Sequence, residues 1–323
     1  MRLLRGSDCI LGCGQCRLSQ NGLGEGDGRS DSQSDRARRP FWHVDATGRI
    51  GAGGQAWRST CREAIMTTEP VYLHAASEVG PLESCGMIHV WHAMLDSAFA
   101  GRREYFEGLL SPDEHERAGR YHFEKDRNRF VAARAILRTL IEGYSGLDAR
   151  RITFKYNRYG KPLLESDDGQ DLVFNVSHSG ERALYVFARG MPVGVDLERL
   201  RSDVDHSQIA RRFFTADETS VLEKLPEEQR LDAFFNGWTR KEALIKAMGQ
   251  GLAFGLNSFD VSLRPGEPPV LLRTRYDEDD VEHWAIGDIP VESGYKAAFA
   301  ARGQDLNVLF YVFDPDQAGT VYP

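Results

Sequence analysis

Two carboxylates stand two residues apart in the segment VGVDLE, residues 193–198. In an extended strand alternate side chains face the same side, so Asp196 and Glu198 project together while Val195 and Leu197 face a core. Neighbouring carboxylates repel and raise each other's pKa unless a cation lies between them. Oxygen ligands of this kind suit Mg²⁺, which completes its shell with water and phosphate. The segment therefore predicts a magnesium site, and an amphipathic strand with a solvated acidic face is the alternative.

A second group of charged residues lies in the segment WTRKEALIK, residues 238–246. We expect it within a helix from about residue 227 to residue 248, ended by a glycine at position 249. At about 100° per residue, Lys241, Glu242 and Lys246 fall within roughly 140° of arc. Two ammonium groups beside a carboxylate can hold a pyrophosphate and lend a metal one more oxygen ligand. The alternative is a surface ion pair between Glu242 and Lys246, worth a few tenths of a kcal/mol.

Two polar turns complete the candidate set. The first, NVSHSG at residues 175–180, is expected as a turn between two apolar strands. Its hydroxyls, its imidazole and its backbone N–H groups could grip a phosphate, and a plain hairpin is the alternative. A serine hydrolase is not indicated, because Ser177 and Ser179 lack a Gly-x-Ser-x-Gly elbow. The second turn, YGKP at residues 159–162, contains Lys161 and is by itself only a turn signal.

The elements that must position these residues are short strands and two longer helices. Apolar alternation predicts strands on both sides of a helix over about residues 125–143, and again on both sides of the helix over residues 227–248. The chain is therefore predicted to be α+β. We expect two similar, pseudo-symmetric α/β halves, each a small antiparallel sheet with helices, with the active site between them.

The first 65 residues differ from the rest of the chain. They contain 11 of the 32 glycines and show no sustained hydrophobic periodicity, so they cannot bury enough apolar surface to offset chain entropy. We expect residues 1–65 to be a disordered extension. Residues 66–190 are predicted to form the N-terminal half and residues 191–323 the C-terminal half.

The overall composition is that of a soluble globular protein. Of 323 residues, 41% are apolar and 27% charged, and no run approaches the ~18 apolar residues of a membrane span. The first residues lack a secretory signal, and five cysteines, an odd number, do not suggest a disulfide framework. We therefore expect a cytoplasmic protein without a membrane partner. The net charge of −8 argues against nucleic-acid binding, because phosphate backbones favour basic surfaces.

Taken together and in order, the four segments resemble the Sfp-type 4′-phosphopantetheinyl transferases. The shared pattern also includes an FFT segment with an acid three residues after its threonine, at residues 213–218. The resemblance covers about residues 87–305. It implies an enzyme that moves the 4′-phosphopantetheine arm of coenzyme A to a serine of an apo acyl or peptidyl carrier protein, releasing 3′,5′-ADP. The two-halved build also implies a monomer.

The resemblance implies roles for individual residues, which group by ligand. The Mg²⁺ ligands are Asp196, Glu198 and Glu242. The pyrophosphate contacts are Ser177, His178, Lys241 and Lys246, and the adenosine 3′-phosphate contacts are Lys161 and Arg117. Family members often carry a second basic residue where Glu114 stands here, so Arg120 or Arg134 is expected to compensate.

Several alternatives stay open at the level of sequence. The proton of the carrier serine goes to Glu242, to Glu218 or to a metal-bound water. Lys246 is expected to stabilise the reacting pyrophosphate. A catalytically silent module that binds coenzyme A or a carrier protein, and a Mg²⁺-dependent hydrolase of nucleotides or pyrophosphate, are the rival functions. The carrier can belong to a fatty-acid, polyketide or nonribosomal-peptide synthase.

Overall fold

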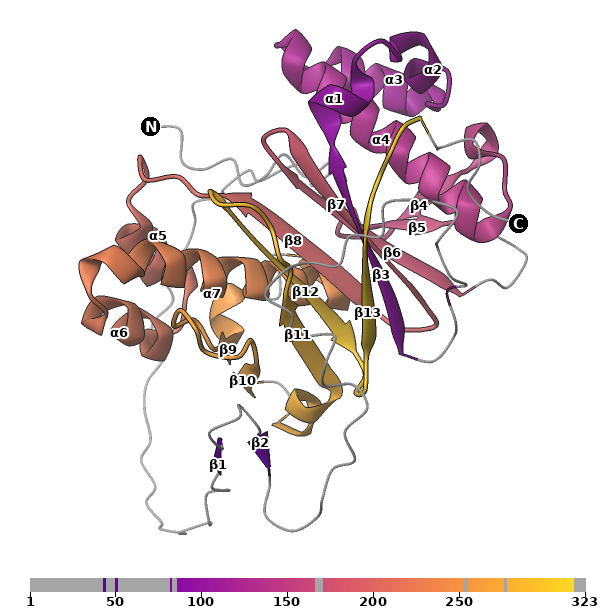
Figure 1. Ribbon diagram of the computed structural model, residues 1–323. Helices are drawn as coiled ribbons and strands as arrows, with labels where there is room; N and C mark the ends of the chain where they lie inside the picture. Colours follow the sequence, from indigo (N-terminus) through magenta and orange to yellow (C-terminus); the bar gives the residue numbers. More distant parts are fainter. Residues whose placement is uncertain are drawn as a thin grey trace, which may run out of the picture.

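The computed structural model describes residues 43–44, 50–51, 82, 86–165, 171–251, 255–275 and 278–316. Its two principal sheets carry one long helix each, with smaller helices and strands around them (Figure 1). The predicted α+β fold class is confirmed. The expected disorder of residues 1–65 concerns residues outside the described part, apart from the paired two-residue strands β1 (His43–Val44) and β2 (Ile50–Gly51).

The first sheet has four strands in the order β13-β3-β7-β6. Neighbours are antiparallel except β13, which runs parallel to β3. The strands are β3 (Met87–Met94), β6 (Leu172–Ser179), β7 (Arg182–Arg189) and β13 (Asn307–Val312). The predicted division at residues 190 and 191 is therefore crossed, because β13 comes from the end of the chain and completes the sheet of the N-terminal half.

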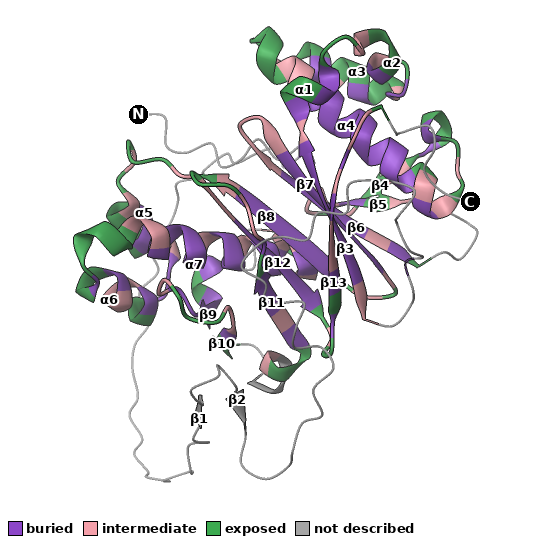
Figure 2. Ribbon diagram, viewed as in Figure 1, coloured by how far each residue is buried: buried purple, intermediate pink, exposed green. Residues whose placement is uncertain are grey.

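The long helix α4 (Glu124–Ser145) covers this sheet, and a buried apolar cluster fills the space between them. Figure 2 shows α4 and the strands as the buried parts of this half, while α2 and α3 expose much of their surface. A capping box at Ser111, with its proline at the first helical position, starts α3. The remaining elements are α1 (Leu95–Phe99), α2 (Arg103–Glu107), α3 (Pro112–Gly119), η2 (Ala149–Arg151), β4 (Phe154–Tyr156) and β5 (Pro162–Leu164).

The second sheet has three antiparallel strands in the order β11-β12-β8. They are β8 (Val193–Arg199), β11 (Trp284–Asp288) and β12 (Tyr295–Arg302). The long helix α7 (Glu227–Met248) packs against this sheet and ends at Gly249, which has a φ of 67°. The remaining elements are α5 (His206–Phe213), α6 (Ala216–Lys224), η4 (Leu256–Ser258), β9 (Phe259–Val261), β10 (Leu271–Thr274) and η5 (Glu278–His283).

An apolar cluster between the two sheets joins the halves. Val193, Val195 and Leu197 of β8 lie in it with residues of β3 and β7. The alternate residues of β8, Asp196 among them, consequently lie on the opposite face, as strand alternation predicts, and this face meets α7. Within the described part of the chain, no helix is long and apolar enough to cross a membrane.

Helix α7 crosses β8 at Gly194. A Cβ atom at this position would lie 2.2 Å from the carbonyl oxygen of Ala243 and 2.3 Å from the nitrogen of Ala247. These are backbone atoms that cannot rotate away, so only glycine permits this crossing. The close approach brings the acidic residues of β8 next to the charged residues of α7.

Candidate active site

Asp196 is the centre of a polar cluster formed by β6, β8 and α7. Its side chain is 1% exposed, and its Oδ1 atom lies 2.6 Å from the Nζ atom of Lys246. The Oγ atom of Ser177 donates to the same Oδ1 at 3.0 Å and accepts from Lys246 Nζ at 2.9 Å. The structure thus brings together three residues that the sequence predicts for the site, each from a different element.

Glu198 and Glu242 belong to the same electrostatic cluster. Burial, followed by the charge of Asp196, raises the pKa of Glu198 to about 8. The same two causes, in the same order, raise the pKa of Glu242 to about 7. Lys246 opposes both shifts. The three predicted metal ligands therefore lie close enough to disfavour each other's charge, as expected for carboxylates that share a site.

The cluster suits a hard cation in its chemistry. Asp196 Oδ2 is buried and accepts no hydrogen bond within the described part of the chain. Yet across the described ranges no group of three or more His, Cys, Asp or Glu side chains converges closely enough to hold a metal ion. An uncompensated carboxylate oxygen among oxygen-only donors fits Mg²⁺ better than a soft transition metal. The donor types are therefore those that Mg²⁺ prefers, but among the described residues the carboxylates do not converge as a metal site, and Lys246 provides the positive charge beside Asp196.

The segment NVSHSG is not the turn that the sequence suggests. Residues 175–179 form the end of β6, and only Gly180 and Glu181 lie between β6 and β7. Alternate side chains of this strand accept hydrogen bonds from backbone N–H groups of β8. The pairs are Asn175 Oδ1 with Val195 N (2.9 Å), Ser177 Oγ with Leu197 N (3.3 Å) and Ser179 Oγ with Arg199 N (3.0 Å).

These three contacts form a seam in which side-chain oxygens replace the carbonyls of a β-ladder. Ser179 also donates to Glu198 Oε2 at 3.1 Å, as Ser177 does to Asp196, so the seam orients two of the acids. The sequence placed Asn175 and Ser179 in a candidate segment but did not predict these contacts with β8 and its acids. The signal was present as polar residues with a period of two in an otherwise apolar strand. His178 alternates to the other face of β6.

Lys241 and Glu218 lie outside the cluster. Lys241 is fully buried, forms an ion pair with Glu218 at 2.8 Å, and donates to the carbonyls of Leu256 (2.7 Å) and Phe259 (2.5 Å). Glu218 accepts from the backbone of Thr215 and closes the capping box of α6. The expectation that Lys241 flanks a pyrophosphate is corrected here, and so is the expectation of Glu218 as a base, because each neutralises the other in the interior.

Lys161 does not project toward solvent. Its Nζ atom has three backbone carbonyls as acceptors, those of Lys246 (2.7 Å), Val193 (3.2 Å) and Ala247 (3.4 Å). An ammonium group has three protons, so these acceptors account for all of them. This arrangement differs from the predicted contact with a 3′-phosphate. Arg117, the other residue predicted there, is half-buried on α3 and places its guanidinium 5.3 Å from the centroid of the Phe130 ring.

Glu114, where a basic residue was expected, has a structural role. It is 2% exposed, and its carboxylate accepts from Arg134 Nε at 2.6 Å and from Arg138 Nε at 2.7 Å. Burial is the largest single influence and acts to raise the pKa of Glu114, but the two guanidinium groups and the backbone N–H of Ser111 together hold it below its usual value. Arg134 therefore lies in the interior, where it is paired with Glu114. The exposed Arg120 pairs with Glu116 at 2.6 Å.

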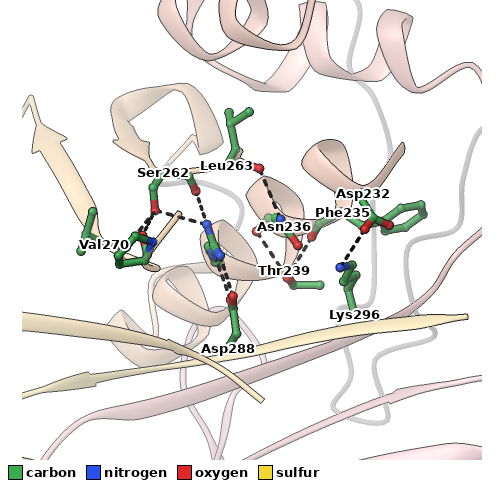
Figure 3. A network of polar contacts seen from close by, with 11 residues as sticks. Asp232, Phe235, Asn236, Thr239, Ser262, Leu263, Val270, Asp288 and Lys296 are labelled. Carbon is green, nitrogen blue, oxygen red and sulfur yellow. Dashed lines mark hydrogen bonds and ion pairs between the residues drawn. The ribbon is translucent and has the colours of Figure 1, made fainter. Parts of the chain in front are cut away.

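Charged contacts away from the acids fix the position of α7. Arg240, which is buried, donates to both oxygens of Asp288 (2.8 and 2.6 Å) and to the carbonyl of Ser262 (2.7 Å). Lys296 pairs with Asp232 at 3.2 Å, and lies opposite Glu198 in the ladder of β12 with β8. Figure 3 shows Asp288 and Ser262, and the Asp232–Lys296 pair, around α7. Sequence reasoning missed Arg240 and Lys296, since their partners are distant in the chain.

Comparison with known proteins places the chain in a family. One family model, described as the 4′-phosphopantetheinyl transferase superfamily, matches residues 192–301, and another, described as 4′-phosphopantetheinyl transferase, N-terminal, matches residues 103–188. The 4′-phosphopantetheinyl transferase HetI of Nostoc sp. is 36% identical over 217 residues, which are 67% of this chain and 88% of that protein. The chain belongs to the 4′-phosphopantetheinyl transferase superfamily.

Other members of the superfamily are similar over a comparable length of the chain. The 4′-phosphopantetheinyl transferase Sfp of Bacillus subtilis is 32% identical over 204 residues, 63% of this chain and 87% of that protein. The human L-aminoadipate-semialdehyde dehydrogenase-phosphopantetheinyl transferase is 28% identical over 210 residues, 61% of this chain and 68% of that protein. The resemblance to Sfp-type transferases noted from the sequence motifs is confirmed.

Proposed function

We propose that this protein transfers the 4′-phosphopantetheine arm of coenzyme A to a serine of an apo carrier protein and releases 3′,5′-ADP. Membership of the superfamily supports the reaction, since HetI and Sfp are both named for it. One observation in the structure carries the proposal. Asp196, Glu198, Glu242 and Lys246 form a single electrostatic cluster where β8 and α7 cross, a charged centre suited to a pyrophosphate with its cation.

Magnesium is part of the proposal. Asp196, Glu198 and Glu242 would hold the ion, which is supported by the buried, uncompensated Oδ2 atom of Asp196 and by the raised pKa values of the two glutamates. When bound, the ion neutralises charge on the pyrophosphate of coenzyme A. Lys246, which already bridges Asp196 and Ser177, would swing little to reach a phosphate oxygen beside the same carboxylate.

The chain's own groups supply the rest of the chemistry. The serine oxygen of the carrier forms a bond to the β-phosphorus of coenzyme A, and the bond from that phosphorus to the oxygen of 3′,5′-ADP breaks. The serine proton passes to Glu242, our choice of general base because it is the carboxylate of α7 in the same electrostatic cluster as Lys246. Lys246 stabilises the negative charge that moves to the leaving group. His178 is assigned to the pyrophosphate and Arg117 to the 3′-phosphate, both from the family resemblance.

We further propose a cytoplasmic monomer that serves a fatty-acid, polyketide or nonribosomal-peptide carrier. One chain contributes β6, β8 and α7 to the cluster, so no second copy is needed to complete it. The rival function, a Mg²⁺-dependent hydrolase, would cleave the pyrophosphate without an acceptor serine.

A panel of apo carrier proteins tests the proposal. Each carrier is incubated with coenzyme A, Mg²⁺ and the protein, and its mass is compared with that of a reaction lacking coenzyme A. We expect one carrier class to gain the mass of a single arm, with one equivalent of 3′,5′-ADP released for each arm transferred. Release of 3′,5′-ADP at the same rate without any carrier would instead support the hydrolase.

A further inference from the structure

The turn between β4 and β5 binds the end of α7. Lys161 places its ammonium group on the carbonyls of Lys246 and Ala247, both in the last turn of the helix. Its third acceptor is the carbonyl of Val193, the first residue of β8. One side chain of the N-terminal half thus holds the two elements that carry the acidic cluster, at the place where they lie against each other.

Helix ends explain why this contact is favourable. The last four carbonyls of a helix have no partner within the helix, and the end of the helix carries a partial negative charge. A cation is stabilised there, and more so when solvent is excluded. Burial lowers the pKa of Lys161 to about 8, so the group is still charged at neutral pH.

Asn157 prepares the turn for this contact. Its Oδ1 atom accepts from the backbone nitrogens of Tyr159 (2.9 Å) and Lys161 (3.0 Å), which fixes the shape of the turn. Its Nδ2 atom donates to the carbonyl of Gly249 at 2.8 Å. The turn therefore reaches the end of α7 with two side chains, at Lys246–Ala247 and at Gly249, and both are directed at backbone atoms.

We propose that Lys161 is a positioning residue for the transfer reaction, which holds the backbone of Lys246 against the start of β8. This inference rests on the proposed function. Lys246 donates to Asp196 on β8, so a shift of α7 relative to β8 alters that contact directly. A misplacement on the order of 1 Å can cost about 100-fold in rate. Lys161 acts through Lys246 and does not touch the 3′-phosphate.

The test compares Lys161→Met with Lys155→Met. Lys155 is a matched control, because it lies in the same hairpin with its side chain 67% exposed and pairs with Glu165. Each variant is assayed with coenzyme A and with dephospho-coenzyme A, which lacks the 3′-phosphate. For Lys161→Met we expect kcat to fall on the order of 10- to 100-fold with both co-substrates, an almost unchanged KM, and unchanged discrimination between them. Lys155→Met should match the wild type.

Hydrogen exchange provides a readout that needs no substrate. In Lys161→Met the amides of residues 245–249 should exchange faster, while those in the middle of α4 should not change. If Lys161→Met fails to fold, Lys161→Arg, which keeps the charge but changes the donor geometry, replaces it in both measurements. A raised KM for coenzyme A with unchanged kcat, lost discrimination and unchanged exchange would overturn the inference and make Lys161 a phosphate ligand. If the wild type transfers no arm to any carrier, the proposed function fails, whereas the exchange comparison still decides whether Lys161 holds α7.

Discussion

Asp196, which we propose as a metal ligand, disfavours the charged forms of the two glutamates beside it. Burial raises the pKa of both Glu198 and Glu242, and the charge of Asp196 raises it further, so in the folded protein without a cation these neighbouring carboxylates disfavour one another's charge. Lys246 offsets only part of that repulsion. Asp196→Asn should therefore reduce arm transfer at least about 100-fold, while the melting temperature without metal stays within about 4 °C of the wild type. The measurements are a carrier mass assay and a thermal melt.

A large loss of melting temperature in Asp196→Asn would show that Asp196 is chiefly structural. Near-normal transfer at millimolar Mg²⁺ would remove it from the metal site.

Magnesium should stabilise the wild type but not the Asp196→Asn variant. A ligand that binds only the folded state stabilises it by about 2.7 kcal/mol at 100 times its dissociation constant. We expect Mg²⁺ to raise the melting temperature of the wild type in a saturable way that a chelator reverses. Asp196→Asn should show little of this rise, because it lacks the buried oxygen that no donor satisfies. Equal shifts in both proteins would indicate binding elsewhere.

His89 gives the fold a separate dependence on pH. It is fully buried, its Nδ1 atom lies 2.8 Å from the hydroxyl of Tyr144, and burial lowers its pKa from 6.5 to about 4. The unfolded chain therefore binds the proton first as the pH falls. The stability associated with a neutral His89 is complete above pH 6.5 and is lost between pH 6.5 and 4, by up to about 3 kcal/mol.

Urea unfolding at several pH values checks this prediction. His89→Gln should flatten the decline between pH 6.5 and 4, whereas the same change at the exposed His115 should leave it as in the wild type. An identical acid limb in all three proteins would contradict the assignment to His89.

At the scale of elements, the crossing of α7 over β8 depends on one missing side chain. Gly194→Ala would place a Cβ atom within 2.3 Å of two backbone atoms of α7, so the helix must move. We expect a loss of about 3 kcal/mol or more in the free energy of unfolding, and a fall in kcat because Lys246 and Glu242 move with the helix. Gly119→Ala at the end of α3, where a Cβ atom meets nothing within 4 Å, is the control and should be neutral or slightly stabilising.

Local patterns predict most of these elements but not their partners. The bounds of α7 follow from its apolar spacing and the glycine after it, and the facing of Asp196 follows from strand alternation. Helical spacing also predicts that Lys241 and Lys246 lie within about 140° of arc on α7. It could not show that Lys241 is taken by Glu218, because that pairing depends on where α6 packs. The function of Ser179 likewise depends on β8 lying beside β6, a contact that exists only in the folded chain.

The same reasoning applies to Lys161. A turn signal locates the residue but says nothing of what its ammonium group will meet. Its acceptors come from residues 193, 246 and 247, and only the docking of the two halves brings them within reach.

At the scale of the whole molecule, the two halves are one structural unit. β13 inserts beside β3, where Val308, Tyr311 and the following Phe313 are all less than 8% exposed. Burial of each such side chain contributes about 1.5–3 kcal/mol. A chain ended after Arg302 should thus lose cooperative unfolding and transfer activity, while one ended after Asp316 should retain both. Circular dichroism melts of the two truncations decide it, and a stable, cooperative shorter chain would contradict the prediction.

The position of β13 also sets the order in which the molecule can fold as it is synthesised. β3 is made early, and β7 can pair with it on one side as soon as both strands have left the ribosome. The other edge of β3 stays open until the residues from Asn307 onward emerge, after the whole of the second sheet. An open edge of this kind is a site for pairing with foreign strands. Completion of the first sheet is therefore a late event. Although the two halves look alike in the finished protein, the first sheet can be completed only after the second has been synthesised.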